Sequence, residues 1–280
     1  MHLVSFDTIT KYRAFEYNEI RQYFLLSNIF LEIMMQILKF ENVGLTYFSD
    51  NGETEAIKDL NFDVNSGDFV SLVGPSGCGK TTILSLISGL IKPTKGTITH
   101  NCNKNTFVGY MFQKDNLFEW RTILGNVYLG LELQKKKTKE NIEYVNNLLK
   151  KYNLWEFRNK YPKQLSGGMR QRVALIRTLA LKPSVLLLDE AFSALDYQTR
   201  LSVCDDVYKI IKQEGVTAIL VTHDISEAIS LSDKIIILSK RPAKVKKTLD
   251  INLKQYKSPL EKRESVEAKN YFKQIWKELQ

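Results

Sequence analysis

The 280-residue sequence predicts an α/β fold in which helices cover both faces of a mainly parallel sheet. Two observations lead to this prediction. After residue 180, short apolar runs alternate with helical stretches, which is typical of parallel strands joined by helices. Earlier in the chain, an apolar run at residues 69–73 leads into a glycine-rich loop and then into a helix-periodic segment that ends at Gly89.

The expected elements follow in chain order. Between residues 116 and 155 the apolar residues recur at three- and four-residue steps, which predicts helices. Outside that segment, β-rich apolar runs bounded by turn residues predict strands at residues 37–48, 56–64, 69–73, 97–100, 107–112, 185–188, 218–222 and 235–238.

The glycine-rich loop and the start of its helix carry the first functional motif. The motif consists of Gly74, Pro75, Ser76, Gly77, Cys78, Gly79, Lys80, Thr81 and Thr82, and it matches the phosphate-binding pattern G-x-x-x-x-G-K-[ST]. Its glycines let successive N–H groups point at a polyphosphate, and the helix start adds its positive dipole end. Lys80 would reach the terminal phosphates, and the Thr81 hydroxyl is placed to bind Mg²⁺. A glycine-rich turn that binds nothing is the alternative, which the flanking strand and helix disfavour.

A second motif is the apolar strand at residues 185–188, which ends in the acids Asp189 and Glu190. Strand ends of a parallel sheet meet at one edge, so both carboxylates are expected beside the phosphate loop. Asp189 is suited to hold Mg²⁺, and Glu190 is suited to polarise an attacking water. A single acid that closes a strand is commonly structural, but a pair in a chain with a phosphate loop favours chemistry.

A third motif is Ser166-Gly167-Gly168, which stands just before a long apolar-periodic helix. Such a helix start offers a second anion-binding site. One nucleotide cannot fill two phosphate sites on one chain. A second copy of the protein could, however, bring its Ser166 loop to the γ-phosphate held by the first.

With these motifs in this order, the chain resembles the ATP-binding subunit of an ABC transporter from about residue 38 to at least residue 239. The resemblance implies a P-loop NTPase core of the RecA-like type, with an antiparallel β subdomain and an inserted helical subdomain at about residues 114–172. It implies ATP and Mg²⁺ as cofactors. It also implies that Tyr47 stacks on adenine, that Gln113 contributes to the metal site, and that Gln113 and His223 sense the γ-phosphate. Each of these three residues has a structural alternative: a strand aromatic, a surface residue and a packed histidine.

The resemblance further implies the partners. Two ATP molecules would lie between two head-to-tail copies, and loss of the γ-phosphate would open this homodimer. A membrane permease would dock on the helical subdomain near Leu117, Phe118 and Trp120, with an extracytoplasmic solute-binding protein as an indirect partner. The expected location is therefore the cytoplasmic face of the membrane.

The residues in and around these motifs, including Trp120-Arg121, resemble those of importers of nitrate, sulfonates, taurine and thiamine-pyrimidine precursors. Two alternatives stay open at this point. One is a soluble ABC ATPase that acts on nucleic acid or the ribosome, and the other is an exporter subunit.

Composition restricts these classes. Hydrophobic residues make up 44% and charged residues 25%, which is ordinary for a globular protein, and no apolar stretch is long enough to span a membrane. The three cysteines lack metal-ligand spacing and indicate a reducing compartment. Of the net charge of +9, most lies in residues 240–280, with 12 Lys or Arg against 5 Asp or Glu. The nearly neutral main domain argues against nucleic acid as a partner.

Three segments are expected: an extension at residues 1–36, an ATPase domain at 37–240 and a basic helical tail at 241–280. The extension lacks a clear period, and we expect translation to start at Met34 or Met35; an appended amphipathic segment is the alternative. The tail is expected to end in a helix whose apolar stripe packs into the core or a docking surface, formed by Tyr271, Phe272, Ile275, Trp276 and Leu279.

Overall fold

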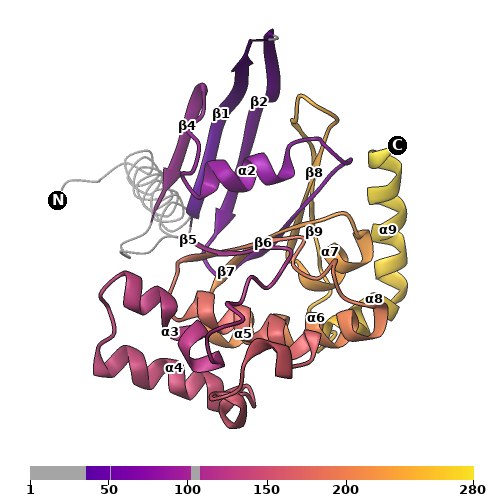
Figure 1. Ribbon diagram of the computed structural model, residues 1–280. Helices are drawn as coiled ribbons and strands as arrows, with labels where there is room; N and C mark the ends of the chain where they lie inside the picture. Colours follow the sequence, from indigo (N-terminus) through magenta and orange to yellow (C-terminus); the bar gives the residue numbers. More distant parts are fainter. Residues whose placement is uncertain (1–35, 51, 102–107) are drawn as a thin grey trace, which may run out of the picture.

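The computed structural model describes residues 36–50, 52–101 and 108–280 (Figure 1). Within these ranges no helix combines the length and the apolar character needed to cross a membrane. The expected translation start at Met34 or Met35 lies outside the described residues.

A six-stranded sheet forms the centre of the molecule. Its strands are parallel except for the last, which is antiparallel to its neighbour. In spatial order they are β5 (Val108–Met111), β6 (Val185–Asp189), β7 (Thr217–Thr222), β3 (Phe69–Val73), β8 (Lys234–Leu238) and β9 (Val245–Asp250). Long apolar runs form these strands because both faces of the sheet are covered.

Alternate residues of the central strands pack on opposite faces. Leu186 and Leu188 join the cluster formed by the helical side of the molecule, whereas Leu187 joins the cluster that contains the phosphate-loop helix and the second sheet. The helices on the first face are α3 (Ile123–Leu133), α4 (Lys139–Lys151), α5 (Gly167–Leu179) and α6 (Tyr197–Glu214). Helix α2 (Lys80–Ile87) lies on the other face, where Ile83 and Leu84 are fully buried.

The second sheet is antiparallel, with the order β2-β1-β4. Its strands are β1 (Gln36–Ser49), β2 (Gly52–Asn65) and β4 (Lys95–His100). It lies at the top of Figure 1, with α2 beside it, whereas α3, α4 and α5 lie at the opposite end. The predicted combination of a mainly parallel sheet, an antiparallel sheet and a group of helices is therefore confirmed.

The last part of the chain is not helical throughout. Helices α8 (Pro259–Glu264) and α9 (Val266–Leu279) pack against α7 (Ile225–Leu231), but they are preceded by β9, which pairs with β8. No strand was expected at β9, because its charged residues leave it without an apolar run. The tail thus contributes the edge strand of the central sheet.

The expected apolar stripe of α9 is divided by the packing. Ile275 is fully buried, while Tyr271 and Leu279 are partly buried against the same cluster. Phe272 and Trp276 keep 37% and 53% of their surface exposed, and their rings stack with centroids 6.1 Å apart. One side of the stripe is therefore core and the other remains open to solvent.

Candidate nucleotide site

The phosphate loop connects β3 to α2. Gly77 and Gly79 have φ values of +71° and +117°, which glycine adopts without strain. Gly74 is required for a different reason: a Cβ atom there would lie 2.9 Å from the Cys78 Sγ and 3.0 Å from the Leu238 Cβ. The loop is therefore held against β8 by close packing. Burial of Cys78 raises the pKa of its thiol.

The Lys80 side chain bonds back to carbonyl groups of its own loop. Its Nζ donates hydrogen bonds to the carbonyl oxygens of Gly74 at 2.7 Å and Pro75 at 3.0 Å, and only 8% of the residue is exposed. The third donor of this ammonium group has only a long contact, 4.0 Å to the Cys78 Sγ, which a phosphate oxygen could replace. The loop carbonyls thereby hold the charge of Lys80 at the phosphate position.

The Asp189 carboxylate ends β6 beside the start of α2. The Thr81 hydroxyl lies 3.4 Å from Asp189 Oδ1, and the Tyr110 hydroxyl donates to Asp189 Oδ2 at 2.9 Å. Burial and this carboxylate together raise the pKa of Tyr110. Two hard oxygen donors that approach each other suit Mg²⁺, so Thr81 and Asp189 fit the expected ion. Tyr110 was not predicted; no signal beyond its place on the strand next to β6 points to it.

Glu190 and His223 face each other across the ends of neighbouring strands. Glu190 Oε1 lies 3.4 Å from His223 Nδ1, and the Glu190 backbone N–H donates to the Val221 carbonyl at 2.9 Å. Glu190 has a φ of +46°, in the left-handed region that non-glycine residues rarely adopt. Such backbone strain persists where surrounding structure imposes it, commonly at functional sites. The strain and the backbone hydrogen bond direct the Glu190 carboxylate toward His223.

A cavity of about 680 Å³ lies between the phosphate loop and the Glu190–His223 pair, and its polar lining suits a phosphate group. It is lined by Ser76, Gly77, Gly79, Lys80, Thr81, Thr82, Glu190 and His223. The geometry thus brings the phosphate loop together with two of the three expected catalytic residues.

Gln113, the third of these residues, reaches the site indirectly. Its Nε2 donates to Ser193 Oγ at 2.9 Å, and Ser193 Oγ donates to the Glu190 carbonyl at 2.9 Å. The sequence does not predict this bridge. Gln113 is exposed and does not line the cavity.

Two other expected contributors lie apart from the cavity. Ser166 caps α5 by accepting from the Met169 N–H, and both Ser166 and Gly167 are exposed. Gly168 is buried, and a Cβ there would lie 2.9 Å from Val203 Cγ2. Tyr47 pairs with Thr54 in the antiparallel sheet and is 45% exposed. Neither the Ser166 loop nor Tyr47 lines the cavity of its own chain.

A buried carboxylate, that of Glu227, contacts Thr222, the residue that precedes His223. Glu227 is 4% exposed and accepts hydrogen bonds from the Thr222 hydroxyl and, at 3.6 Å, from the Cys204 thiol. Burial raises the pKa of Glu227. Its own N–H donates to Asp224, the N-cap of α7. Sequence reasoning missed this residue, although the Asp-x-x-Glu spacing is that of a helix start.

Comparison with known proteins identifies the family of this chain. A family model described as ABC transporter matches residues 57–193. Over 250 residues the chain is 46% identical to an uncharacterized ABC transporter ATP-binding protein, YtlC, of Bacillus subtilis, covering 88% of this chain and 96% of that protein. The chain belongs to the ABC transporter ATP-binding proteins.

Other relatives of this ABC ATPase carry named roles. It is 39% identical over 220 residues to the nitrate import ATP-binding protein NrtD of Synechocystis, covering 77% of this chain and 83% of that protein. It is 41% identical over 212 residues to the aliphatic sulfonates import ATP-binding protein SsuB of Bacillus thuringiensis, covering 74% and 83%.

A solved dimer supports the fold. The ATP-binding cassette MJ0796, in a dimeric post-hydrolysis state with ADP and phosphate bound, is 33% identical with a TM-score of 0.62. The match covers 77% of this chain and 99% of that one. The predicted family is thus confirmed, and the chain is an ATP-binding enzyme that hydrolyses ATP.

Proposed function

We propose that this ABC ATPase powers the import of a small solute through a separate membrane permease. The solute would be nitrate, an organic sulfonate, taurine or a thiamine precursor, delivered outside the membrane by a solute-binding protein. The names of the relatives support import, since nitrate, aliphatic sulfonates and taurine recur among them. The same names disfavour a role on nucleic acid or the ribosome and a role in export.

The active unit we propose is a homodimer with ATP between the copies. The exposed Ser166 and Gly167 do not line the cavity of their own chain, which leaves them available to a second copy. MJ0796, which has the same fold, is a dimer in two solved structures. In this unit the γ-phosphate would join Lys80 of one copy to Ser166 and Gly168 of the other. Tyr47, which is 45% exposed on the antiparallel sheet, would stack on adenine.

Within each site, Glu190 would take a proton from the attacking water. Its carboxylate at 3.4 Å from His223 allows the histidine to orient it and to contact the γ-phosphate. Thr81 and Asp189 would hold Mg²⁺, which supplies charge neutralisation to the phosphates when bound. Gln113 would report on this site through Ser193.

The permease surface we propose lies where two subdomains meet. A cavity of about 410 Å³ is lined by the segment from Lys114 to Leu117 and by residues at the start of α5. Glu119 pairs with Arg170, which lines this cavity, at 2.7 Å. The next residue, Trp120, is 74% exposed and stacks on Phe118 with ring centroids 4.8 Å apart. A concave site next to an exposed aromatic pair suits an inserted helix of a partner. Leu117, only 6% exposed, lines this cavity and also packs in the core of the helical side.

Purification from detergent-solubilised native membranes tests this proposal. A tagged chain is expected to recover a membrane protein with several spanning helices, and Trp120→Asp is expected to reduce that recovery by about tenfold because it places a charge in an apolar contact. Leu133→Asp is the matched control, since Leu133 is 75% exposed at the end of α3 and does not belong to the Phe118–Trp120 ring pair. Recovery of ribosomes or nucleic acid instead of a permease would overturn the proposal.

A further inference from the structure

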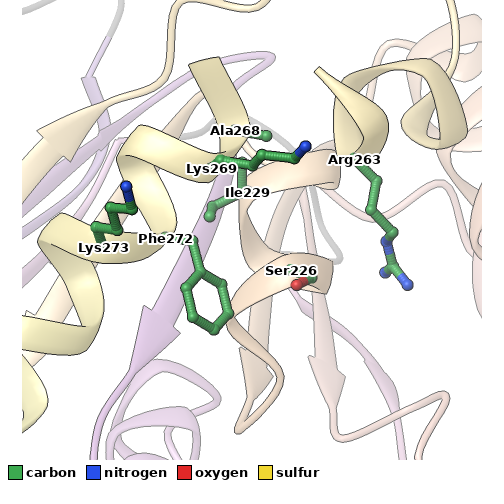
Figure 2. Close-up of a pocket in the computed structure, with 7 residues that line it drawn as sticks. All are labelled: Ser226, Ile229, Arg263, Ala268, Lys269, Phe272 and Lys273. Carbon is green, nitrogen blue, oxygen red and sulfur yellow. The ribbon is translucent and has the colours of Figure 1, made fainter. Parts of the chain in front are cut away.

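A second cavity lies far along the chain from the nucleotide motifs, between α7, α8 and α9. Its volume is about 310 Å³, at the lower end of the range for small-molecule sites. Figure 2 shows side chains from all three helices around it. None of the residues that line the nucleotide cavity lines this one.

The inner part of the cavity is apolar. Ile229 on α7 and Ala268 on α9 are 1% and 5% exposed and form its floor. The Phe272 ring extends from α9 beside Ser226 of α7, as Figure 2 shows, and its stacking on Trp276 fixes the ring plane. A flat apolar group could pack against this ring.

The rim of the cavity is cationic. Lys269 extends from α9 in the direction of α8, which carries Arg263, and Lys273 lies beyond Phe272 (Figure 2). In the described part of the chain, these three side chains form no hydrogen bond or ion pair. Elsewhere in the tail, Lys247 pairs with Glu278, whereas Lys277 likewise has no side-chain partner within the described residues.

These cations repel one another. Lys269 and Lys273 stand four residues apart on one helix, a spacing at which like charges are destabilising. The buried Glu227 attracts Arg263 but forms no ion pair with it, and its carboxylate accepts hydrogen bonds from Thr222 and Cys204. An anion in the cavity would relieve this repulsion and pair with Arg263 and Lys269.

We propose that this cavity binds a small organic anion with an apolar or aromatic body. Its carboxylate, sulfonate or phosphate would pair with Arg263 and Lys269, while its body would lie on Ile229 and against the Phe272 ring. The volume fits a single ring or a short chain. It is less than half that of the nucleotide cavity.

Fluorine NMR on the full-length protein tests this site, with para-fluorobenzenesulfonate as the probe and saturating Mg-ADP to occupy the phosphate loop. We expect saturable binding with a Kd of about 1 mM or tighter, which is ordinary for a ligand of this size. Competition by methanesulfonate, which lacks the ring, or by fluorobenzyl alcohol, which lacks the charge, should be at least about tenfold weaker.

Variants separate this site from general attraction to a basic surface. Lys269→Gln and Phe272→Ala should each weaken probe binding by at least about fivefold, through loss of a charged contact and of ring stacking respectively. Lys277→Gln is the matched control, because it removes the same charge from an exposed position of α9 that does not line the cavity. Absence of saturable binding would overturn the proposal. Equal weakening by Lys277→Gln and Lys269→Gln, or equal binding of the neutral alcohol, would overturn it as well.

Discussion

The close packing of the phosphate loop against β8 leads to a quantitative prediction for Gly74→Ala. The added Cβ would lie 2.9 Å from the Cys78 Sγ and 3.0 Å from the Leu238 Cβ. Favourable contacts between such atoms lie near 3.5 to 4.0 Å. Both neighbours are 1% exposed, so neither can move into solvent. Either the loop or β8 must therefore shift by about half an ångström or more.

The size of the effect follows from this geometry. Overpacking in a filled core costs about 1 to 3 kcal/mol in the free energy of unfolding. For a chain of 280 residues, whose unfolding entropy is about 0.6 kcal/mol/K, that corresponds to a fall in Tm of about 2 to 5 °C. Because the displaced atoms belong to the loop that presents Lys80, we also expect weaker ATP binding.

Urea denaturation and nucleotide binding measure the two effects, in the Cys78 protein and in a Cys78→Ala background. Removing the Sγ atom should relieve part of the overpacking, so Gly74→Ala should cost about 1 kcal/mol less in the second background. Gly44→Ala is the control, because its Cβ would approach no atom closer than 3.4 Å.

Two results would refute this reasoning. One is a Gly74→Ala protein that is as stable as the Gly44→Ala protein. The other is an equal cost in both backgrounds at position 78, which would mean that the sulfur atom does not limit the space at Gly74.

Two further predictions concern the carboxylates of the site. Glu190→Gln should slow ATP hydrolysis by about 10²-fold or more, while ATP still binds and holds a dimer. Steady-state assays measure the rate and size-exclusion chromatography measures the dimer, with Glu143→Gln, at an exposed position of α4, as the control. Normal turnover by the Glu190→Gln protein would show that Glu190 is not the base. Burial raises the pKa of Glu227, so the folded protein retains a proton that the unfolded chain releases above about pH 4.5. Wild-type stability should fall as pH rises from that point toward the raised pKa, and Glu227→Gln should lack this loss. Denaturation at about pH 5 and about pH 8 measures it, and a stability difference between the two proteins that is equal at both pH values would contradict it.

Much of the fold follows from local sequence patterns. The strand, loop and helix around Lys80 are predicted because their backbone conformations depend on neighbouring residues: glycines where φ is positive and apolar residues at helical spacing. Strand β9 escapes prediction because an edge strand can be rich in exposed lysines. Its assignment depends on pairing with β8, which no local pattern specifies.

The candidate site also has one part that the sequence predicts and another that depends on the fold. Asp189 and Glu190 are recognised as a pair from the strand that precedes them. The partners of these acids come from other strands: Tyr110 from β5 reaches Asp189, and His223 after β7 reaches Glu190. The strand order β5-β6-β7 brings them together, and this order is a property of the whole sheet.

By itself, the sequence determined the phosphate loop, the acidic strand end and the family, because each depends on residue types at short, fixed spacings. Only the tertiary structure decided which side chains meet. It placed the Tyr110 hydroxyl against Asp189, set the Cys204 thiol against Glu227, and left three cations around a cavity between α7, α8 and α9. The physical reason is that these contacts join segments far apart in the chain, so they depend on how sheets and helices pack together.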